Sequence, residues 1–143
     1  AESIKRISND RQTEPHAYSQ RFGTLPPAFS RAATVTFGEQ SWFLVSGTAS
    51  VVGEASHHVD DACAQTDETI ENLYTLLKDV PEGVAYDGST EWLAYVPNEH
   101  VAAHVVEELM RRCNATKENI IVRRQALCRP ELLVEIECAV ALA

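Results

Sequence analysis

The chain has 143 residues, of which 12 are Lys or Arg and 21 are Asp or Glu, so its formal net charge is −9. This length fits one domain with a sizeable core, and the acidic balance argues against a broad nucleic-acid surface, which needs a basic patch. We therefore expect no nucleic acid as partner. No apolar run approaches the roughly 18 residues that a membrane helix needs, so we expect no membrane partner either. A small anionic ligand is compatible with this charge, because a few arginines can reverse the local field of a pocket.

The cysteines and histidines do not suggest a metal site. The four cysteines are far apart and form no CxxC pair, and a disulfide framework is not expected in a chain of this size. Adjacent histidines such as His57 and His58 point apart on most backbones, so we interpret them as solvated loop residues. The sequence therefore predicts no metal, no cofactor and a reducing, cytoplasmic setting.

The first 32 residues divide into two stretches. Residues 1–16 are polar and lack periodicity, so we interpret them as a linker or tail, with the domain running from 17 to 143. The next stretch, "AYSQRFGTLPPAFSRA", carries Tyr18, Arg21 and Arg31. Its double proline should hold the backbone extended.

A hairpin and a loop of small residues follow. "ATVTFGEQSWFLVSG" (33–47) is rich in β-branched and aromatic residues around a turn at Gly38, which predicts two strands. "SGTASVVGEAS" (46–56) is then a loop. Gly47, Thr48 and Ala49 in this loop either form a turn that needs little bulk or let the backbone approach a ligand closely.

Two helices and three more strands complete the chain. A helix begins near Asp60 or Asp61, and a second helix begins after Asn98, because these residues can act as N-caps. Strands are predicted at "STEWLAYVP" (89–97), at "NIIVRRQAL" (119–127) and at the carboxyl end. The apolar stripe of the first helix is Thr66, Ile70, Leu73, Leu77 and Val80, and that of the second is Val101, Val105, Val106, Leu109 and Met110.

The predicted order β-β-α-β-α-β-β is that of an α+β fold. Strands joined through helices imply parallel crossovers, so one mixed sheet should carry both helices on a single face. No third helix is available for the other face, where we expect Val122, Leu127 and Val134. Self-association would cover that face.

The closing segment, "LCRPELLVEIECAVALA", contains two carboxylates within an apolar run. Glu135 and Glu137 share one face of a strand, because residues i and i+2 do so. On an edge strand both would lie in water. On a central strand at least one would lie in a cleft, where a carboxylate is costly unless it has a partner or a function.

Four segments together resemble the RidA/YjgF superfamily in order and spacing: "PPAFSRA", "WFLVSGTASVVGE", "AQTDETIENLYTLLKD" and "VEIECAVA". The resemblance covers residues 26–143 and implies a chorismate-mutase-like fold that forms a trimer with ligand clefts between subunits. It does not extend to the arginine of the deaminase branch, whose position falls at Ile121. Arg123 and Arg124 lie two and three residues away, where the side-chain face differs.

The amino-terminal part of the domain also resembles the carboxy-terminal half of the chorismatases, in "AYSQRFGTLPPAFSRA" followed by "FLVSGTASVVGE". Ser19 and Gln20 differ from the Pro and Arg expected there. This resemblance implies chorismate as substrate and Glu135 as the general acid that protonates its enolpyruvyl methylene carbon. The alternative for Glu135 is a surface carboxylate, and Glu137 is interpreted as an exposed or supporting partner.

The same resemblance indicates which residues would bind the substrate. Guanidinium groups suit carboxylates, so Arg21 and Arg31, with Tyr18, are candidates to bind the chorismate dianion, although each could be solvated surface. Cys128 is expected near Glu135 across a tight turn. A cysteine at this position resembles the 3-hydroxybenzoate-forming branch of the chorismatases. The alternative is that Cys128 is a small buried hydrophobe.

Three functions therefore compete. The first is a chorismatase that releases pyruvate and a hydroxybenzoate, with 3-hydroxybenzoate favoured over the dihydrodiol. The second is a deaminase of enamines and imines, which the residue at position 121 disfavours. The third is a non-catalytic trimeric module that binds an anion.

Overall fold

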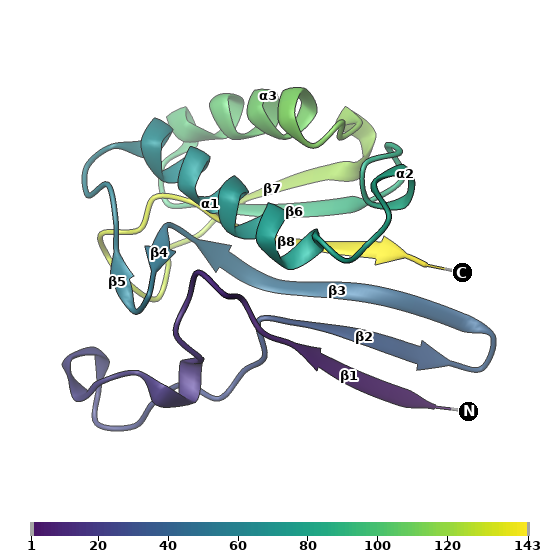
Figure 1. The fold of residues 1–143 in the computed structure, drawn as a ribbon. Helices are drawn as coiled ribbons and strands as arrows, with labels where there is room; N and C mark the ends of the chain where they lie inside the picture. Colours follow the sequence, from purple (N-terminus) through teal and green to yellow (C-terminus); the bar gives the residue numbers. More distant parts are fainter. Residues whose placement is uncertain (1, 143) are drawn as a thin grey trace.

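The computed structural model describes residues 2–142. A six-stranded sheet carries the two long helices on one face (Figure 1). The strand order in the sheet is β1-β2-β3-β8-β6-β7. The strands of this sheet are β1 (Ser3–Ile7), β2 (Ala32–Phe37), β3 (Gln40–Ala49), β6 (Glu91–Val96), β7 (Ile120–Arg124) and β8 (Glu135–Ala141); the long helices are α1 (Ala62–Leu77) and α3 (Ala102–Arg112).

The chain connections confirm the predicted order of elements and, within residues 2–142, add three strands and a short α-helix, besides four 3₁₀ helices. Strand β8 lies between β3 and β6 and is antiparallel to both, whereas β6 and β7 are parallel and are joined through α3. The sheet is therefore mixed, as predicted. The additions are β1, a small hairpin of β4 (Val51–Val52) and β5 (Ala55–Ser56), and the short helix α2 (Glu82–Ala85).

The β2–β3 hairpin turns where the sequence places a glycine. Phe37 pairs with Gln40, so Gly38 and Glu39 form a two-residue loop. Gly38 has a φ of 62°, in the left-handed region that glycine adopts without a side-chain clash. The predicted hairpin is confirmed.

The amino-terminal segment is not a tail. Residues Ser3–Ile7 pair antiparallel with β2 as the edge strand of the sheet. Asn9 and Gln12 are buried, and the Asn9 side chain donates to the backbone oxygen of Asn72 at 3.1 Å. The expectation of a linker over residues 1–16 was wrong because an edge strand exposed on both faces has a tail's polar composition.

Helices α1 and α3 cover the sheet with the stripes that their spacing predicts. Asp61 caps α1 by accepting a hydrogen bond from the Ala64 backbone N–H at 2.9 Å. All residues of the first predicted stripe are buried, although Val80 lies just beyond the end of α1. In the second stripe Val101, Val105 and Leu109 are buried. Met110 was assigned to this stripe wrongly, since it is 43% exposed on the outer side of α3.

The opposite face of the sheet has no helix over it in the described part of the chain (Figure 1). Leu44 and Ile121 are 41% and 48% exposed there. Val122 and Val134, predicted for this face, instead belong to the core on the helix side. Ala94 pairs with both Val122 and Ile136, so the three side chains share the buried face, and the open face takes the alternate residues.

Leu127 is the third residue predicted for the open face, and it too lies elsewhere. It packs on a small second cluster of Ala49, Val51 and Leu132. None of the helices formed by residues 2–142 is long and apolar enough to cross a membrane.

Candidate functional site

A cavity of about 270 Å³ lies where the end of β3, the loop before β8 and the segment before β2 meet. It is lined by six of the eight residues predicted for the site: Tyr18, Arg31, Gly47, Ala49, Cys128 and Glu135. The other lining residues are Gln12, Phe22, Leu25, Pro27, Phe29, Val51, Arg129 and Leu132. Residues more than 100 positions apart in the chain thus share one hollow.

An irregularity in β3 makes room for the carboxylate of Glu135. Val45 pairs with Cys138 and Thr48 with Ile136, so Ser46 and Gly47 together oppose a single residue of β8. This is a β-bulge. A Cβ atom on Gly47 would lie 2.7 Å from Cδ of Glu135 and 2.9 Å from its Oε2, which is closer than such atoms approach. Because Gly47 has no side chain, it leaves the space in the cavity that this carboxylate occupies.

Glu135 is half-buried, and its surroundings favour the neutral acid. Burial raises the pKa of the Glu135 carboxyl above its ordinary value, and the charge of Glu137 raises it further. Burial acts in this direction because a low-dielectric wall destabilises the charged form. The carboxyl consequently holds its proton to higher pH than an exposed glutamate does.

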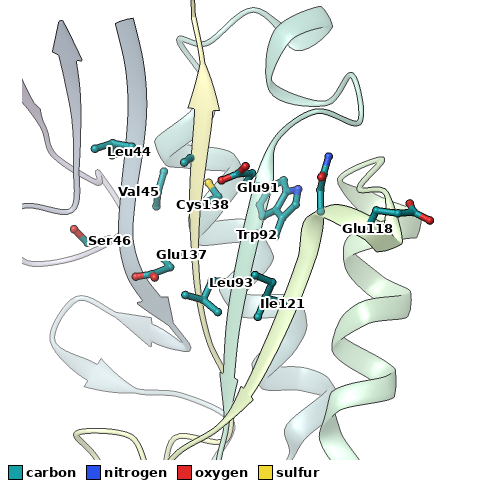
Figure 2. A pocket seen from close by; sticks show the side chains of 12 residues that line it. Leu44, Val45, Ser46, Glu91, Trp92, Leu93, Glu118, Ile121, Glu137 and Cys138 are labelled. Atoms are coloured by element: carbon teal, nitrogen blue, oxygen red, sulfur yellow. The ribbon is translucent and has the colours of Figure 1, made fainter. Parts of the chain in front are cut away.

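Glu137 lies on the same face of β8, but its side chain lines a different cavity. It lines a cavity of about 520 Å³ on the open face, together with Leu44 and Leu93 (Figure 2). Its Oε1 accepts a hydrogen bond from Tyr95 Oη at 3.3 Å. The structure thus places the two carboxylates in different cavities, as expected if Glu137 does not share the cleft of Glu135 equally.

Arg31 is the buried cation of the cavity. It is only 5% exposed, and its Nη2 donates to the backbone oxygen of Thr13 and to Tyr18 Oη, each at 2.6 Å. Its Nε is buried without a hydrogen-bond acceptor among residues 2–142. A buried donor without a partner costs free energy, which an anionic ligand could offset.

Arg129 is a cavity residue that the sequence reasoning missed. Its guanidinium carbon lies 4.0 Å from the ring centroid of Phe22 and 5.4 Å from that of Tyr18. Its Nη1 donates to Ser56 Oγ at 3.0 Å. The one sequence signal was its position next to Cys128, which had already been chosen as a candidate.

Two predicted site residues lie away from the cavity. Arg21 is exposed and stacks on Phe22 at 4.8 Å, but it is not among the lining residues. Thr48 is 2% exposed and its Oγ1 donates to the backbone oxygen of Ser46 at 2.9 Å. Because Thr48 pairs with Ile136, a core residue, it faces the helices rather than the cavity.

Cys128 reaches the cavity by a different route from the one predicted. Strands β7 and β8 are not neighbours, since β6 lies between them, so no tight turn joins them. Cys128 lies instead in the loop 125–134 and is exposed rather than a buried hydrophobe. Gln65 of α1 fixes this loop: its Nε2 donates to the backbone oxygen of Glu131 at 2.9 Å, and its Oε1 accepts from the Leu133 N–H at 2.8 Å.

Other candidate ligands do not gather around this cavity. His57 and His58 are exposed, and within residues 2–142 no cluster of three or more potential metal-binding side chains occurs. Ile121, which the resemblance aligns with the deaminase arginine, lies on the open face. Arg123 and Arg124 are exposed and do not line the cavity that holds Glu135.

Solved structures with a similar fold cover nearly all of this chain. The crystal structure of a chorismatase superposes with a TM-score of 0.82 at 20% identity, over 96% of this chain and 44% of that one. The YjgF protein of E. coli superposes with a TM-score of 0.65 at 15% identity, over 97% and 99% of the two chains. The fold is that of the RidA/YjgF proteins.

The sequence is also similar to that of curated chorismatases. It is 29% identical over 136 residues to a chorismatase of Streptomyces rapamycinicus and 30% identical over 143 residues to a 3-hydroxybenzoate synthase of Streptomyces hygroscopicus. These alignments cover 88% and 92% of this chain but 40% and 42% of those proteins. The chain thus spans about two fifths of the length of its curated relatives. No protein-family model matches it.

Proposed function

We propose that this RidA-like domain acts on chorismate and releases pyruvate, with Glu135 as the general acid. The supporting observation is the position of the Glu135 carboxyl: it lies over Gly47 in a cavity whose buried Arg31 has an unpartnered donor. The similarity to proteins named chorismatase and 3-hydroxybenzoate synthase supports the choice of substrate.

The first step uses the proton that Glu135 retains. Transfer of this proton to the methylene carbon of the enolpyruvyl group converts the enol ether into an oxocarbenium ion and leaves Glu135 as carboxylate. A general acid works best when its pKa is close to the operating pH, and burial raises the pKa of Glu135 in that direction.

The cation then has two fates. Water can add to the oxocarbenium carbon, and the resulting hemiketal collapses to pyruvate and a ring diol. Alternatively, the neighbouring ring hydroxyl displaces pyruvate, and the ring rearomatises to 3-hydroxybenzoate without net consumption of water. Cys128 lines the same cavity as Glu135, and a poorly hydrated thiol beside the ring would exclude water and favour the second fate.

Arg31 and Tyr18 would hold a carboxylate of the substrate. The Arg31 guanidinium is already oriented by Thr13 and Tyr18, and its free Nε offers a charge-assisted hydrogen bond. Gly47 and Ala49 at the end of β3 let the ligand approach the backbone closely.

The open sheet face suggests an assembly for this domain. It exposes Trp42, Leu44 and Ile121, and it should be covered by two further copies or by equivalent domains of a longer chain. The domain, which includes the edge strand β1, would then be one module of a trimer or pseudo-trimer.

Pyruvate release is the direct test. The chain is incubated with chorismate, and pyruvate is measured by a coupled lactate dehydrogenase assay while the aromatic products are separated by chromatography. We expect stoichiometric pyruvate and a hydroxybenzoate. Chorismate that binds but stays intact would favour the non-catalytic module, and ammonia release from an enamine substrate would favour the deaminase.

A further inference from the structure

Two guanidinium groups enter the cavity from distant parts of the chain. Arg31 precedes β2 and Arg129 lies in the loop before β8, and both line the hollow that contains Glu135. Each guanidinium carbon lies within 5.6 Å of the Tyr18 ring centroid. The aromatic ring thus holds two positive groups around one small volume.

Neither arginine has a carboxylate partner. Within residues 2–142, no Asp or Glu oxygen lies at ion-pair distance from Arg31 or Arg129. The carboxylate of Glu54 is bound by Ser19 instead. One of its oxygens accepts from the Ser19 N–H at 2.8 Å and the other from Ser19 Oγ at 2.6 Å. Arg129 interacts with Glu54 only through the longer-range attraction that helps to lower the pKa of Glu54. Two guanidinium groups without a direct ion-pair partner favour a ligand with two negative charges in the cavity.

The guanidinium plane of Arg129 is held in a fixed orientation by its neighbours. Its guanidinium stacks on Phe22, and Ser56 Oγ, which accepts from its Nη1, donates in turn to Glu131 Oε1 at 2.9 Å. These contacts orient the group, and within residues 2–142 the guanidinium makes no other hydrogen bond that a ligand would have to displace. A guanidinium fork oriented in this way matches the two oxygens of a carboxylate.

We propose that Arg129 binds the second carboxylate of the substrate, so that the cavity selects dicarboxylates over monocarboxylates. The inference rests on the proposed function, in which the substrate is the chorismate dianion with Arg31 at its first carboxylate. Arg129 is then a specificity-determining residue that lies beside the product-determining Cys128 in the same loop.

The test measures binding without turnover. Calorimetric titrations with isophthalate, which has two ring carboxylates, and with benzoate, which has one, are made on the wild-type chain, on Arg129→Gln and on Arg21→Gln. Arg21 is the matched control, because it also stacks on Phe22 but does not line the cavity. We expect the wild type and Arg21→Gln to bind isophthalate at least about tenfold more tightly than benzoate.

Arg129→Gln should lose this preference and bind the two ligands with affinities within about threefold, while its benzoate affinity stays close to that of the wild type. Arg129→Lys, which keeps the charge but not the fork, should retain part of the preference. The proposal is overturned if the wild type does not prefer isophthalate, or if Arg129→Gln keeps the preference.

These outcomes are separate from those of the pyruvate assay. Pyruvate release by a chain with no dicarboxylate preference would remove the role of Arg129 and leave the proposed reaction. A preference that depends on Arg129 in a chain that releases no pyruvate would remove the reaction and leave a dicarboxylate site.

Discussion

Glu135 and Glu137 are two residues apart on one face of β8, yet their surroundings differ. Glu135 lies in a small cavity with Gly47, where burial raises its pKa. Glu137 lies in the cavity of the open face (Figure 2). It accepts a hydrogen bond from Tyr95 Oη. The comparison shows that a shared strand face does not determine the chemistry of a carboxylate: the neighbouring segments do.

The largest difference between the two sites is expected when each glutamate is replaced in turn by glutamine. Glu135→Gln keeps the size of the side chain but loses the transferable proton, so chorismate turnover should fall by roughly two to four powers of ten. Glu137→Gln is the matched control and should cost less than about tenfold. Equal losses in the two variants, measured as kcat for pyruvate release, would contradict the assignment of the acid.

The second prediction concerns the space that Glu135 occupies. In Gly47→Ala the new Cβ would lie 2.7 Å from the carboxyl carbon, so the acid must move from its position. Turnover should fall by about tenfold to a hundredfold, because a displacement of about 1 Å already disturbs a reacting geometry. Gly83→Ala is the control, since a Cβ there meets nothing within 4 Å. A fully active Gly47→Ala would show that the position of Glu135 is unimportant.

The open face can be compared with the helix face by placing a charge on each. Leu44 and Met110 are 41% and 43% exposed on opposite sides of the molecule. If the open face is an interface, Leu44→Asp buries an unpaired charge and should weaken association by at least about tenfold, whereas Met110→Asp should not. Sedimentation velocity measures this difference. A wild-type chain that sediments as a monomer at all concentrations would refute self-association.

Cys128 offers a smaller, qualitative change. Cys128→Ala opens space for water near the ring without altering Glu135, so the products should shift several-fold toward the dihydrodiol. Total consumption of chorismate should stay close to that of the wild type. Chromatography of the products decides the matter, since an unchanged hydroxybenzoate fraction would exclude a steering role for the thiol.

The smallest predicted effect is on folding stability and follows from the pKa of Glu135. Because the folded-state pKa is raised, the contribution of Glu135 to stability is complete below the unfolded-state value of about 4.3 and is lost as pH rises through the raised value. Glu135→Gln does not titrate, so relative to the wild type it should become more stable between acid and neutral pH. Urea unfolding at several pH values measures this difference, and a constant difference would contradict the raised pKa.

Some features of the protein follow from the sequence alone. The buried stripe of α1, a cap at Asp60 or Asp61 and the turn at Gly38 depend on residues close together in the chain, so periodicity and turn chemistry predict them. The shared face of Glu135 and Glu137 is likewise a consequence of strand geometry.

The remaining features depend on pairing between distant segments, so they are established only in the folded chain. The bulge at Ser46 and Gly47 leaves Gly47 and Ala49 in the cavity and turns Thr48 to the core. The pairing of β1 with β2 makes an edge strand of a sequence that resembles a tail. The loop 125–134, held by Gln65, brings Arg129 rather than Arg21 to the cavity. The spacing of residues along the chain does not specify which distant segments pair, so these contacts could not be predicted from it.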